Sequence, residues 1–426
     1  MATVPVWVWL SGQDAPRQAG DLTVEGAAGR FRYLPDYLAC AGAPPLDPVE
    51  LRLVRSKRGI VTTASDGLPG VIRDAKPAGY GADRLFAQAG GNLSPLELLE
   101  RGVPDGVGAV EVCTDIDRKL AWVPKGLEEL KVLTEALEAA APASRALRRL
   151  TDDLDTSAGG ERPKATVVHE GRLWLAKMQD RGDRSALPAR EFVTMRLAQM
   201  AGLDVAPVLL QTFGAHQVLL VERFDRAGDP LRPQRRLYAS AHTVLRLRPA
   251  SVKGDPQRSY LNLGDRLRVW AKGSDDLSGQ LQELWRRMAF NALVGNVDDH
   301  PLNHGLLHEG STQHMWRLSP AFDITPALTM ALDPLAEGPA LSLATGVDGT
   351  SRAGAVRLIA AAGHFDIGAD VAAHWLRVTA KLVAESWESM LREAARPIVA
   401  SAARADQLVA DTRAAFAYTE WLAAQS

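Results

Sequence analysis

The sequence is poor in cysteine and lacks any segment that would direct or anchor it to a membrane. Its two cysteines, Cys40 and Cys113, are far apart, which argues against a disulfide framework and against cysteine-based metal-ligand spacing. The N-terminus carries no basic residues ahead of its apolar ones, so we expect no signal peptide, and no apolar run is long enough to cross a bilayer. We therefore predict a protein of the reducing cytoplasm with no membrane partner.

The chain also lacks a large excess of charge. Its 49 Lys and Arg residues and 51 Asp and Glu residues leave a net charge of −2, which gives no general attraction to nucleic acid or lipid. The length of 426 residues predicts two or three domains or lobes. One local basic group is either a solvated face or a docking surface for an acidic partner; it consists of Arg232, Arg235, Arg236, Arg246 and Arg248.

The densest polar chemistry lies between Met288 and Pro326. Apolar residues at three- and four-residue steps predict a helix that ends at Gly295-Asn296. A short polar loop containing Asp298 and Asn303 follows, and an apolar, strand-like stretch then leads to Asp323. The sequence therefore predicts a helix, a polar loop and a strand that ends near a carboxylate.

This order matches the needs of phosphoryl transfer from ATP. One carboxylate orients the attacking hydroxyl, and an amide oxygen and a second carboxylate hold Mg²⁺; protein kinases take these from an Asp-x-x-x-x-Asn loop and a later Asp beside a Phe. Asp298 and Asn303 have this loop spacing, and Asp323 follows Phe322. The alternative is a polar loop with capping Asn and Asp residues and a solvated Asp323.

A second candidate segment runs from Ser157 to Ala165. Its paired glycines, Gly159 and Gly160, would let backbone N–H groups approach a phosphate, and Lys164 adds a positive charge. The spacing does not match a Walker A loop, and Lys164 is followed by Ala rather than Ser or Thr. A glycine turn between two elements therefore remains the alternative.

Two strand-like runs, Thr166–Glu170 and Leu173–Met178, predict a hairpin. Lys177 lies on an otherwise apolar face of the second strand, where a buried ammonium needs a partner. A nucleotide phosphate would serve, and so would Glu191 at the start of the next helix, as in the Lys–Glu pair of kinases. Alternatively, Lys177 lies at a sheet edge and extends to water.

The whole chain predicts an α+β fold in three parts. Residues 1–145 form a mixed, mostly β region, residues 146–226 carry the ATP-binding portion, and residues 227–426 are helical and carry the catalytic and metal loops. The expected strands include Val4–Leu10, Arg30–Tyr33 and Leu51–Val54. The expected helices include Pro95–Arg101, Gly126–Ala140, Ser144–Leu150, Arg190–Met200, Ala355–Ala362, Val371–Ala394, Pro397–Leu408 and Thr412–Ala424.

Taken together and in this order, the motifs resemble the HipA family of serine/threonine kinase toxins from bacterial type II toxin–antitoxin systems. The motifs that carry the resemblance are Ser157–Ala165, Lys177, Val221–Arg226, Gly295–Asn303 and Leu318–Pro326. The resemblance spans nearly the full length and is strongest between Ser157 and Leu328. It implies a two-lobed, kinase-like fold that uses ATP and Mg²⁺.

The resemblance also implies a role for each motif. Asp298 matches the catalytic Asp, Asn303 and Asp323 match the Mg²⁺ ligands, and Ser157 matches a serine that family members autophosphorylate. A phosphate on Ser157 adds about −1.5 to −2 charge to the loop that holds ATP, and so would switch the kinase off. The implied nucleotide-binding residues are Gly159, Gly160, Glu161, Arg162, Pro163, Lys164, Lys177, Glu222, Arg223, Phe224, His300, Asn303 and Asp323.

One position departs from the pattern of protein kinases, and another departs from that of some HipA relatives. Asn296 stands where protein kinases have a His, and His300 follows the catalytic Asp instead, an arrangement that the HipA family shares. Phe322 stands where some relatives have a Tyr.

By analogy with the family, we expect the substrate to be an aminoacyl-tRNA synthetase, with glutamyl-tRNA synthetase as the first candidate. The expected partner is a DNA-binding antitoxin resembling HipB, through which alone the chain would reach DNA. Two alternatives stay open: a small-molecule phosphotransferase of the aminoglycoside-kinase type, and a catalytically silent pseudokinase that only binds a partner.

Overall fold

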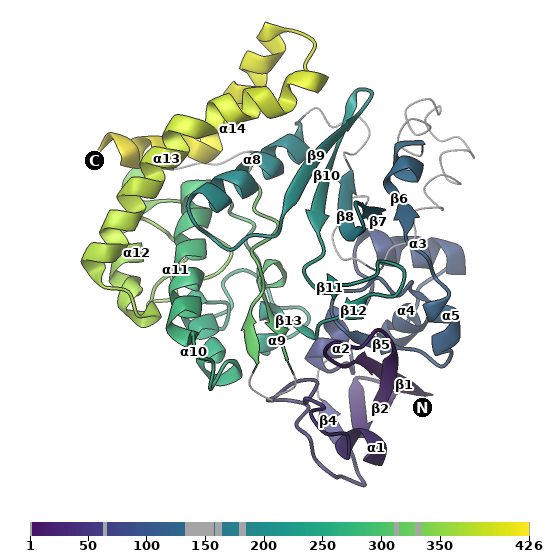
Figure 1. The fold of residues 1–426 in the computed structure, drawn as a ribbon. Coiled ribbons are helices and arrows are strands. Elements are labelled where there is room, and N and C mark those ends of the chain that lie inside the picture. The colour runs from purple at the N-terminus through teal and green to yellow at the C-terminus, as the bar shows by residue number, and fades with distance from the viewer. Residues whose placement is uncertain are drawn as a thin grey trace. The chain divides into compact units, whose positions relative to one another are not determined.

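The computed structural model describes residues 2–62, 66–132, 157, 164–178, 185–310, 315–328 and 334–425. The chain divides into two compact units (Figure 1). Unit 1 comprises Met1–Met178, Glu222–Ala250 and Leu306–Arg317. Unit 2 comprises Gln179–Val221, Ser251–Gly305 and Leu318–Ser426. The domain boundaries expected after residues 145 and 226 stay a prediction.

Unit 1 begins with an antiparallel sheet in the order β4-β3-β2-β1-β5. Its strands are β1 (Ala2–Trp9), β2 (Pro16–Glu25), β3 (Ala28–Tyr33), β4 (Ile60–Thr62) and β5 (Val110–Val112). Val4, Val6 and Val8 alternate along β1 and are all buried, as expected for a strand with one face in the core. These strands confirm the two predicted at Val4–Leu10 and Arg30–Tyr33.

The strand predicted at Leu51–Val54 is wrong. Leu51 forms only an isolated bridge with Asp47, and residues 52–55 are neither strand nor helix. The Asp47 carboxylate accepts hydrogen bonds from the N–H groups of Val49 and Glu50 and so closes a turn there. Such local side-chain bonds compete with strand pairing.

Short helices connect the strands of unit 1: α1 (Pro35–Leu38), α2 (Gly70–Asp74), α3 (Tyr80–Ala89), α4 (Pro95–Arg101), α5 (Ile116–Leu120) and α9 (Ala241–Val244). Helix α4 is confirmed at its predicted bounds. Ser94 accepts a hydrogen bond from the Glu97 N–H, and the Glu97 carboxylate accepts one from the Ser94 N–H. This capping box explains why the helix starts at Pro95.

The predicted hairpin is confirmed as β7 (Lys164–His169) and β8 (Arg172–Met178). Glu170 and Gly171 both have positive φ angles, 50° and 72°, as a two-residue hairpin turn requires. Strand β6 (Lys125–Gly126) pairs parallel with β7. The remaining short strands are β11 (Arg226–Ala227), β12 (Gln234–Arg235), β13 (Tyr238–Ser240), β14 (Gly305–His308) and β15 (Trp316–Leu318).

The helix predicted at Gly126–Ala140 starts later than expected. Gly126 belongs to β6, and residues 127–132 are helical. The rest of that prediction, and the helix predicted at Ser144–Leu150, lie outside the described residues.

Unit 2 is mainly helical. Its hairpin consists of β9 (Val208–Phe213) and β10 (His216–Glu222). Its helices are α8 (Leu187–Met200), α10 (Tyr260–Trp270), α11 (Leu277–Leu293), α12 (Ala355–Ala361), α13 (Ala369–Ala395) and α14 (Ala402–Ala424). Short 3₁₀ turns are η1 (Pro301–Asn303), η2 (Leu335–Glu337), η3 (Ala362–Phe365) and η4 (Arg396–Ile398). In the core Trp387 stacks on Phe416, with ring centroids 4.5 Å apart.

The predicted division of the last helix is wrong. Helix α14 runs without a break from Ala402, and its N-cap is Ser401, whose hydroxyl accepts a hydrogen bond from the Arg404 N–H. Nothing interrupts it near the expected boundary, where the Thr412 hydroxyl donates to the Leu408 carbonyl one turn earlier at 2.6 Å. Pro397 lies within the 3₁₀ turn η4 rather than at the start of a helix.

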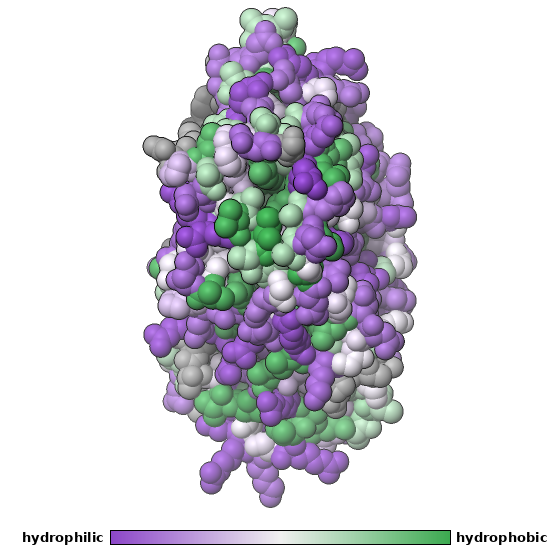
Figure 2. All heavy atoms as spheres, turned by 90° about the vertical axis from the view of Figure 1, so that its left-hand side faces the viewer, coloured by the Kyte–Doolittle hydropathy of each residue, from purple (hydrophilic) through white to green (hydrophobic). Residues whose placement is uncertain are grey.

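Hydrophilic side chains cover most of the face formed by the C-terminal helices, and apolar patches lie between them (Figure 2). Val356, Val371 and Val378 of α12 and α13 are among the exposed apolar residues. Within the described part of the chain, no helix has both the length and the apolarity needed to cross a membrane.

Candidate active site

The predicted catalytic loop begins at the C-terminus of α11. Gly295 has a φ of 62°, and a Cβ there would lie 2.4 Å from the Ala415 carbonyl oxygen, so no other residue fits. The Gly295 N–H donates to the Ala292 carbonyl and the Asn296 N–H to the Asn291 carbonyl. These two bonds form a Schellman motif, which ends the helix and directs the chain into the loop.

Backbone and side-chain hydrogen bonds shape the loop between Asp298 and Asn303. The His300 N–H donates to the Asp298 carbonyl and the Asn303 N–H to the His300 carbonyl, each at 2.8 Å. The Asn303 amide nitrogen also donates to the Asp298 carbonyl at 3.1 Å. This hydrogen bond orients the amide through its nitrogen. The amide oxygen, which is the atom that would bind Mg²⁺, takes no part in this bond.

Asp298 itself is exposed. Its carboxylate is therefore accessible to a hydroxyl group of another molecule, as the orienting group of a phosphotransferase must be. Pro301 at the start of η1 limits the freedom of the backbone between Asp298 and Asn303.

Asp323 adopts a strained backbone conformation. Its φ is 58°, in the left-handed region that non-glycine residues rarely occupy. The residues on either side are held in place: the Ala321 N–H donates to the Asp204 carbonyl at 2.8 Å, and the Thr194 hydroxyl donates to the Ile324 carbonyl. Such strain persists where neighbouring contacts enforce it, often at functional sites.

Unit 2 brings the two predicted metal ligands into one neighbourhood. Asn303 and both neighbours of Asp323, Phe322 and Ile324, line a single cavity of about 10 Å³, which holds roughly one water molecule. Amide and carboxylate oxygens are ligands that Mg²⁺ accepts, together with water and phosphate oxygens. Among the described residues there is no group of three or more His, Cys, Asp and Glu side chains that could hold a metal ion.

A buried hydrogen-bond network lies behind the loop. The Tyr260 hydroxyl donates to Asp299 Oδ2 at 2.5 Å, and the Ser342 N–H donates to Asp299 Oδ1 at 2.6 Å. The Asn291 amide donates to the Tyr260 hydroxyl at 3.0 Å, and His304 Nε2 lies 3.3 Å from that oxygen. These bonds tie the residue after Asp298 to α10, α11 and the segment at Ser342.

Burial dominates the protonation of this network. It raises the pKa of Asp299 to about 7, although hydrogen bonds from Tyr260 and Ser342 act in the opposite direction. Burial also lowers the pKa of His304 to about 3, so this ring is neutral near pH 7. Asp299 is not among the predicted site residues, and nothing local in the sequence signals its contact with Tyr260, 39 residues away.

In unit 1 the two candidate phosphate-binding lysines stand opposite each other. Lys164 of β7 and Lys177 of β8 are paired across the hairpin, so their side chains share one face. Lys164 is buried and Lys177 is partly buried. Two lysines at directly opposed positions concentrate positive charge on one face of the hairpin, which is compatible with the predicted phosphate role. The other residues of the predicted phosphate loop, Gly159 to Pro163, lie outside the described residues.

The predicted hinge, Glu222 to Phe224, continues from β10. The Arg223 N–H donates to the Leu173 carbonyl at 2.9 Å, and Glu222 forms an ion pair with Arg172. The Arg223 side chain is buried and hydrogen-bonded to Asp225 and to the Asp105 carbonyl. This residue could therefore contact a nucleotide only through its backbone.

Ser157 is buried in unit 1. Its hydroxyl donates to the Val103 carbonyl at 2.5 Å, and its N–H donates to the Asp105 carboxylate. A phosphate could reach the Ser157 hydroxyl only after Ser157 leaves these contacts with Val103 and Asp105.

Glu191, the predicted partner of Lys177, is a buried residue of α8 in unit 2.

Comparison with known proteins gives a consistent result. The family model described as the HipA-like C-terminal domain matches residues 156–408. The serine/threonine-protein kinase toxin HipA of Shewanella oneidensis is 26% identical over 262 residues, which are 54% of this chain and 56% of that protein. The alignment thus spans little more than half of the curated relative.

A solved structure matches over almost the full length. It is the complex of HipA, HipB and operator DNA from Shewanella oneidensis, which superimposes with a TM-score of 0.64 at 19% identity and covers 97% of both chains. The similarity confirms the predicted α+β class, with β-sheets and a helical C-terminal part.

Proposed function

The chain belongs to the HipA family, and on that premise we propose that it is an ATP- and Mg²⁺-dependent serine/threonine protein kinase that acts as a growth-inhibiting toxin. The observation that carries the proposal is the geometry of unit 2. An exposed Asp298 and an oriented Asn303 share one short loop, and Asn303 borders the same cavity as both neighbours of the strained Asp323.

In the proposed reaction Asp298 accepts a hydrogen bond from the attacking serine or threonine hydroxyl and orients its oxygen. The oxygens of Asn303 and Asp323 hold the metal ion, which neutralises charge on the phosphates when bound. The hydrogen bond from Asn303 to the Asp298 carbonyl couples the metal ligand to the orienting residue, so both are positioned by one loop.

Lys164 and Lys177 supply positive charge for the phosphates of ATP. Their opposed positions place two ammonium groups on the same face of the hairpin. This arrangement supports a phosphate role for Lys177 over the alternative in which it only extends to water. In the regulatory part of the proposal, phosphorylation of Ser157 needs this residue to leave its contacts with Val103 and Asp105. The phosphate on Ser157 would then prevent this residue from returning to its contacts with Val103 and Asp105.

The proposed substrate is an aminoacyl-tRNA synthetase, with glutamyl-tRNA synthetase as the first candidate. Phosphorylation would stop tRNA charging and slow growth. We further propose that a HipB-like antitoxin binds this chain, because the similar structure from Shewanella oneidensis is a complex of HipA with HipB and operator DNA. Contact with DNA would then depend on the antitoxin.

The test is phosphate transfer from γ-labelled ATP by the purified full chain. The acceptors are glutamyl-tRNA synthetase, other synthetases and a panel of small hydroxyl compounds that includes aminoglycosides. We expect label on a synthetase serine or threonine with the wild type and none with Asp298→Ala. Label on a small molecule alone would show that the chain is a small-molecule kinase instead. If ATP neither binds nor reacts, the chain would be a pseudokinase.

A further inference from the structure

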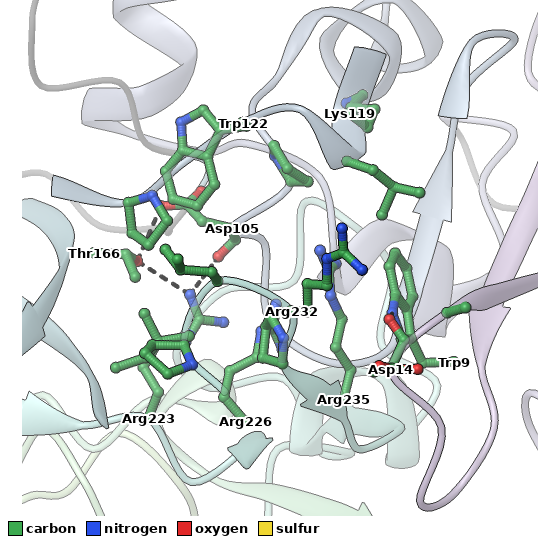
Figure 3. Close-up of a pocket in the computed structure, with 18 residues that line it drawn as sticks. Trp9, Asp14, Asp105, Lys119, Trp122, Thr166, Arg223, Arg226, Arg232 and Arg235 are labelled. Atoms are coloured by element: carbon green, nitrogen blue, oxygen red, sulfur yellow. Dashed lines mark hydrogen bonds between the residues drawn. The ribbon is translucent and has the colours of Figure 1, made fainter. Parts of the chain in front are cut away.

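Unit 1 contains a pocket of about 350 Å³, within the usual range for small-molecule sites. In the view of Figure 3, Arg226, Arg232 and Arg235 lie between Trp122 and Trp9. Leucine and proline side chains complete the walls. The pocket therefore combines a group of guanidinium side chains with flat apolar surfaces.

The buried charges around the pocket do not balance. Four cationic side chains there are at most 9% exposed: Lys119, Arg223, Arg226 and Arg235. Three carboxylates beside them are equally buried: Asp105, Glu111 and Asp225. Four positive and three negative charges leave one buried positive charge, while the exposed Arg232 and the exposed Asp14, which both line the pocket, balance each other.

The ion pairs show where this excess lies. Asp225 is shared by Arg223 at 2.8 Å and Arg226 at 2.6 Å. Glu111 is shared by Lys119 at 2.9 Å and Arg235 at 3.5 Å, so the lysine takes the closer contact. Arg235 is therefore the most weakly paired cation of the group.

Arg235 also has an unused donor. Its Nε is buried and has no hydrogen-bond partner among the described residues. Its guanidinium carbon lies 3.7 Å from the centre of the Trp9 ring, which holds the group in place from one side. Burial lowers the pKa of Arg235, and burial together with the neighbouring Arg223 lowers the pKa of Arg226. Guanidinium groups keep their proton in proteins, so an anion would relieve this repulsion.

We propose that this pocket binds a small organic anion whose carboxylate or phosphate contacts Arg235 and Arg232 and whose flat apolar part packs against Trp122. Carboxylates and phosphates both match the planar donor geometry of a guanidinium. The apolar walls favour a ligand with an aromatic or similarly flat body over a bare inorganic ion.

The proposed site differs from the kinase site. Asp298, Asn303 and Asp323 belong to unit 2, whereas every residue that lines this pocket belongs to unit 1. Only Arg223 is shared with the predicted nucleotide-binding residues, and its side chain is occupied by Asp225 and by backbone carbonyls. The proposal therefore does not rest on the proposed kinase activity.

The test is isothermal titration calorimetry of the full chain with benzoate, phenyl phosphate and the neutral analogue benzamide. We expect at least one anion to bind about tenfold more tightly than benzamide, because one charge-assisted hydrogen bond is of that strength. The better of the two anions then identifies the head group. Equal affinity for benzamide, or no binding of any probe, would overturn the proposal.

Two variants locate the binding. Arg235→Gln keeps much of the stem but removes the charge, and Arg232→Ala changes only an exposed side chain, which protects the test against misfolding. Each should weaken anion binding about tenfold or more without affecting benzamide. Arg236→Ala is the matched control, because Arg236 lies outside the pocket lining and pairs with Glu309.

A loss of the same size in Arg236→Ala, or unchanged affinity in both pocket variants, would contradict the assignment. Saturation with the ATP analogue AMP-PNP and Mg²⁺ provides the last comparison. Anion affinity should stay the same, whereas displacement would assign the binding to the nucleotide site instead.

Discussion

Replacing Asp299 by asparagine should change how the stability of the protein depends on pH. The Asp299 carboxyl is fully buried, and its pKa is raised from 3.8 to about 7. A raised pKa means that the folded state prefers the protonated acid. The contribution of Asp299 to stability is therefore complete below about pH 4 and is lost as the pH rises through about 7.

The size of the effect follows from the shift. A rise of about 3 pKa units corresponds to about 4 kcal/mol between the two protonation states. The asparagine side chain of Asp299→Asn would resemble the protonated acid at every pH. The free energy of unfolding of the variant, relative to the wild type, should therefore rise by about 4 kcal/mol between pH 4 and pH 8. The loss of a hydrogen bond from Tyr260 adds a constant that does not vary with pH in this range.

Urea unfolding followed by tryptophan fluorescence at pH 4, 5, 6, 7 and 8 measures this difference. Asp298→Asn is the matched control, since it removes a charge from the exposed neighbouring position. Only Asp299→Asn should show a free energy of unfolding that rises with pH relative to the wild type. A stability difference that stays constant from pH 4 to pH 8 would refute the conclusion that burial controls the protonation of Asp299.

Three further substitutions test the site and the core. Asp298→Ala should abolish phosphate transfer but leave AMP-PNP affinity largely intact in calorimetry, because the residue orients the hydroxyl and does not hold phosphates. Lys177→Ala should weaken nucleotide binding as well as the rate of transfer, which titrations and initial rates would show. Trp387→Ala should lower the free energy of unfolding by about 3–5 kcal/mol in urea titrations, because this ring is 1% exposed and stacked on Phe416.

A specific result would contradict each of these three predictions. Equal loss of nucleotide affinity in Asp298→Ala would remove its assigned role. Unchanged affinity and rate in Lys177→Ala would show that this side chain only extends to water. A change below about 1 kcal/mol in Trp387→Ala would mean that the helices α13 and α14 repack around the cavity.

Elements specified by neighbouring residues could be predicted from the sequence. The β7–β8 hairpin follows from two apolar runs around Glu170-Gly171, whose φ angles are both positive. The end of α11 follows from Gly295, and the start of α4 follows from its capping box. In each case the determining hydrogen bonds connect residues within a few positions of one another.

Features set by distant contacts could not be predicted. The basic group between Arg232 and Arg248 was expected to be a solvated face or a docking surface, yet Arg235 is only 6% exposed, beneath the ring of Trp9. Asp299 meets Tyr260 from another helix, and no local pattern marks that pair. The segment that precedes β5 and the turn at Asp225 likewise meet only in the folded chain, where the Gly108 N–H donates to Asp225.

Intact mass spectrometry of the purified protein before and after incubation with Mg²⁺-ATP tests the central claim most directly. The wild type should gain one phosphate that maps to Ser157, while Asp298→Ala treated in parallel should gain none. Phosphate on both proteins would contradict the role of Asp298. No phosphate on either, together with no transfer to a synthetase, would contradict the proposal that this chain is a protein kinase.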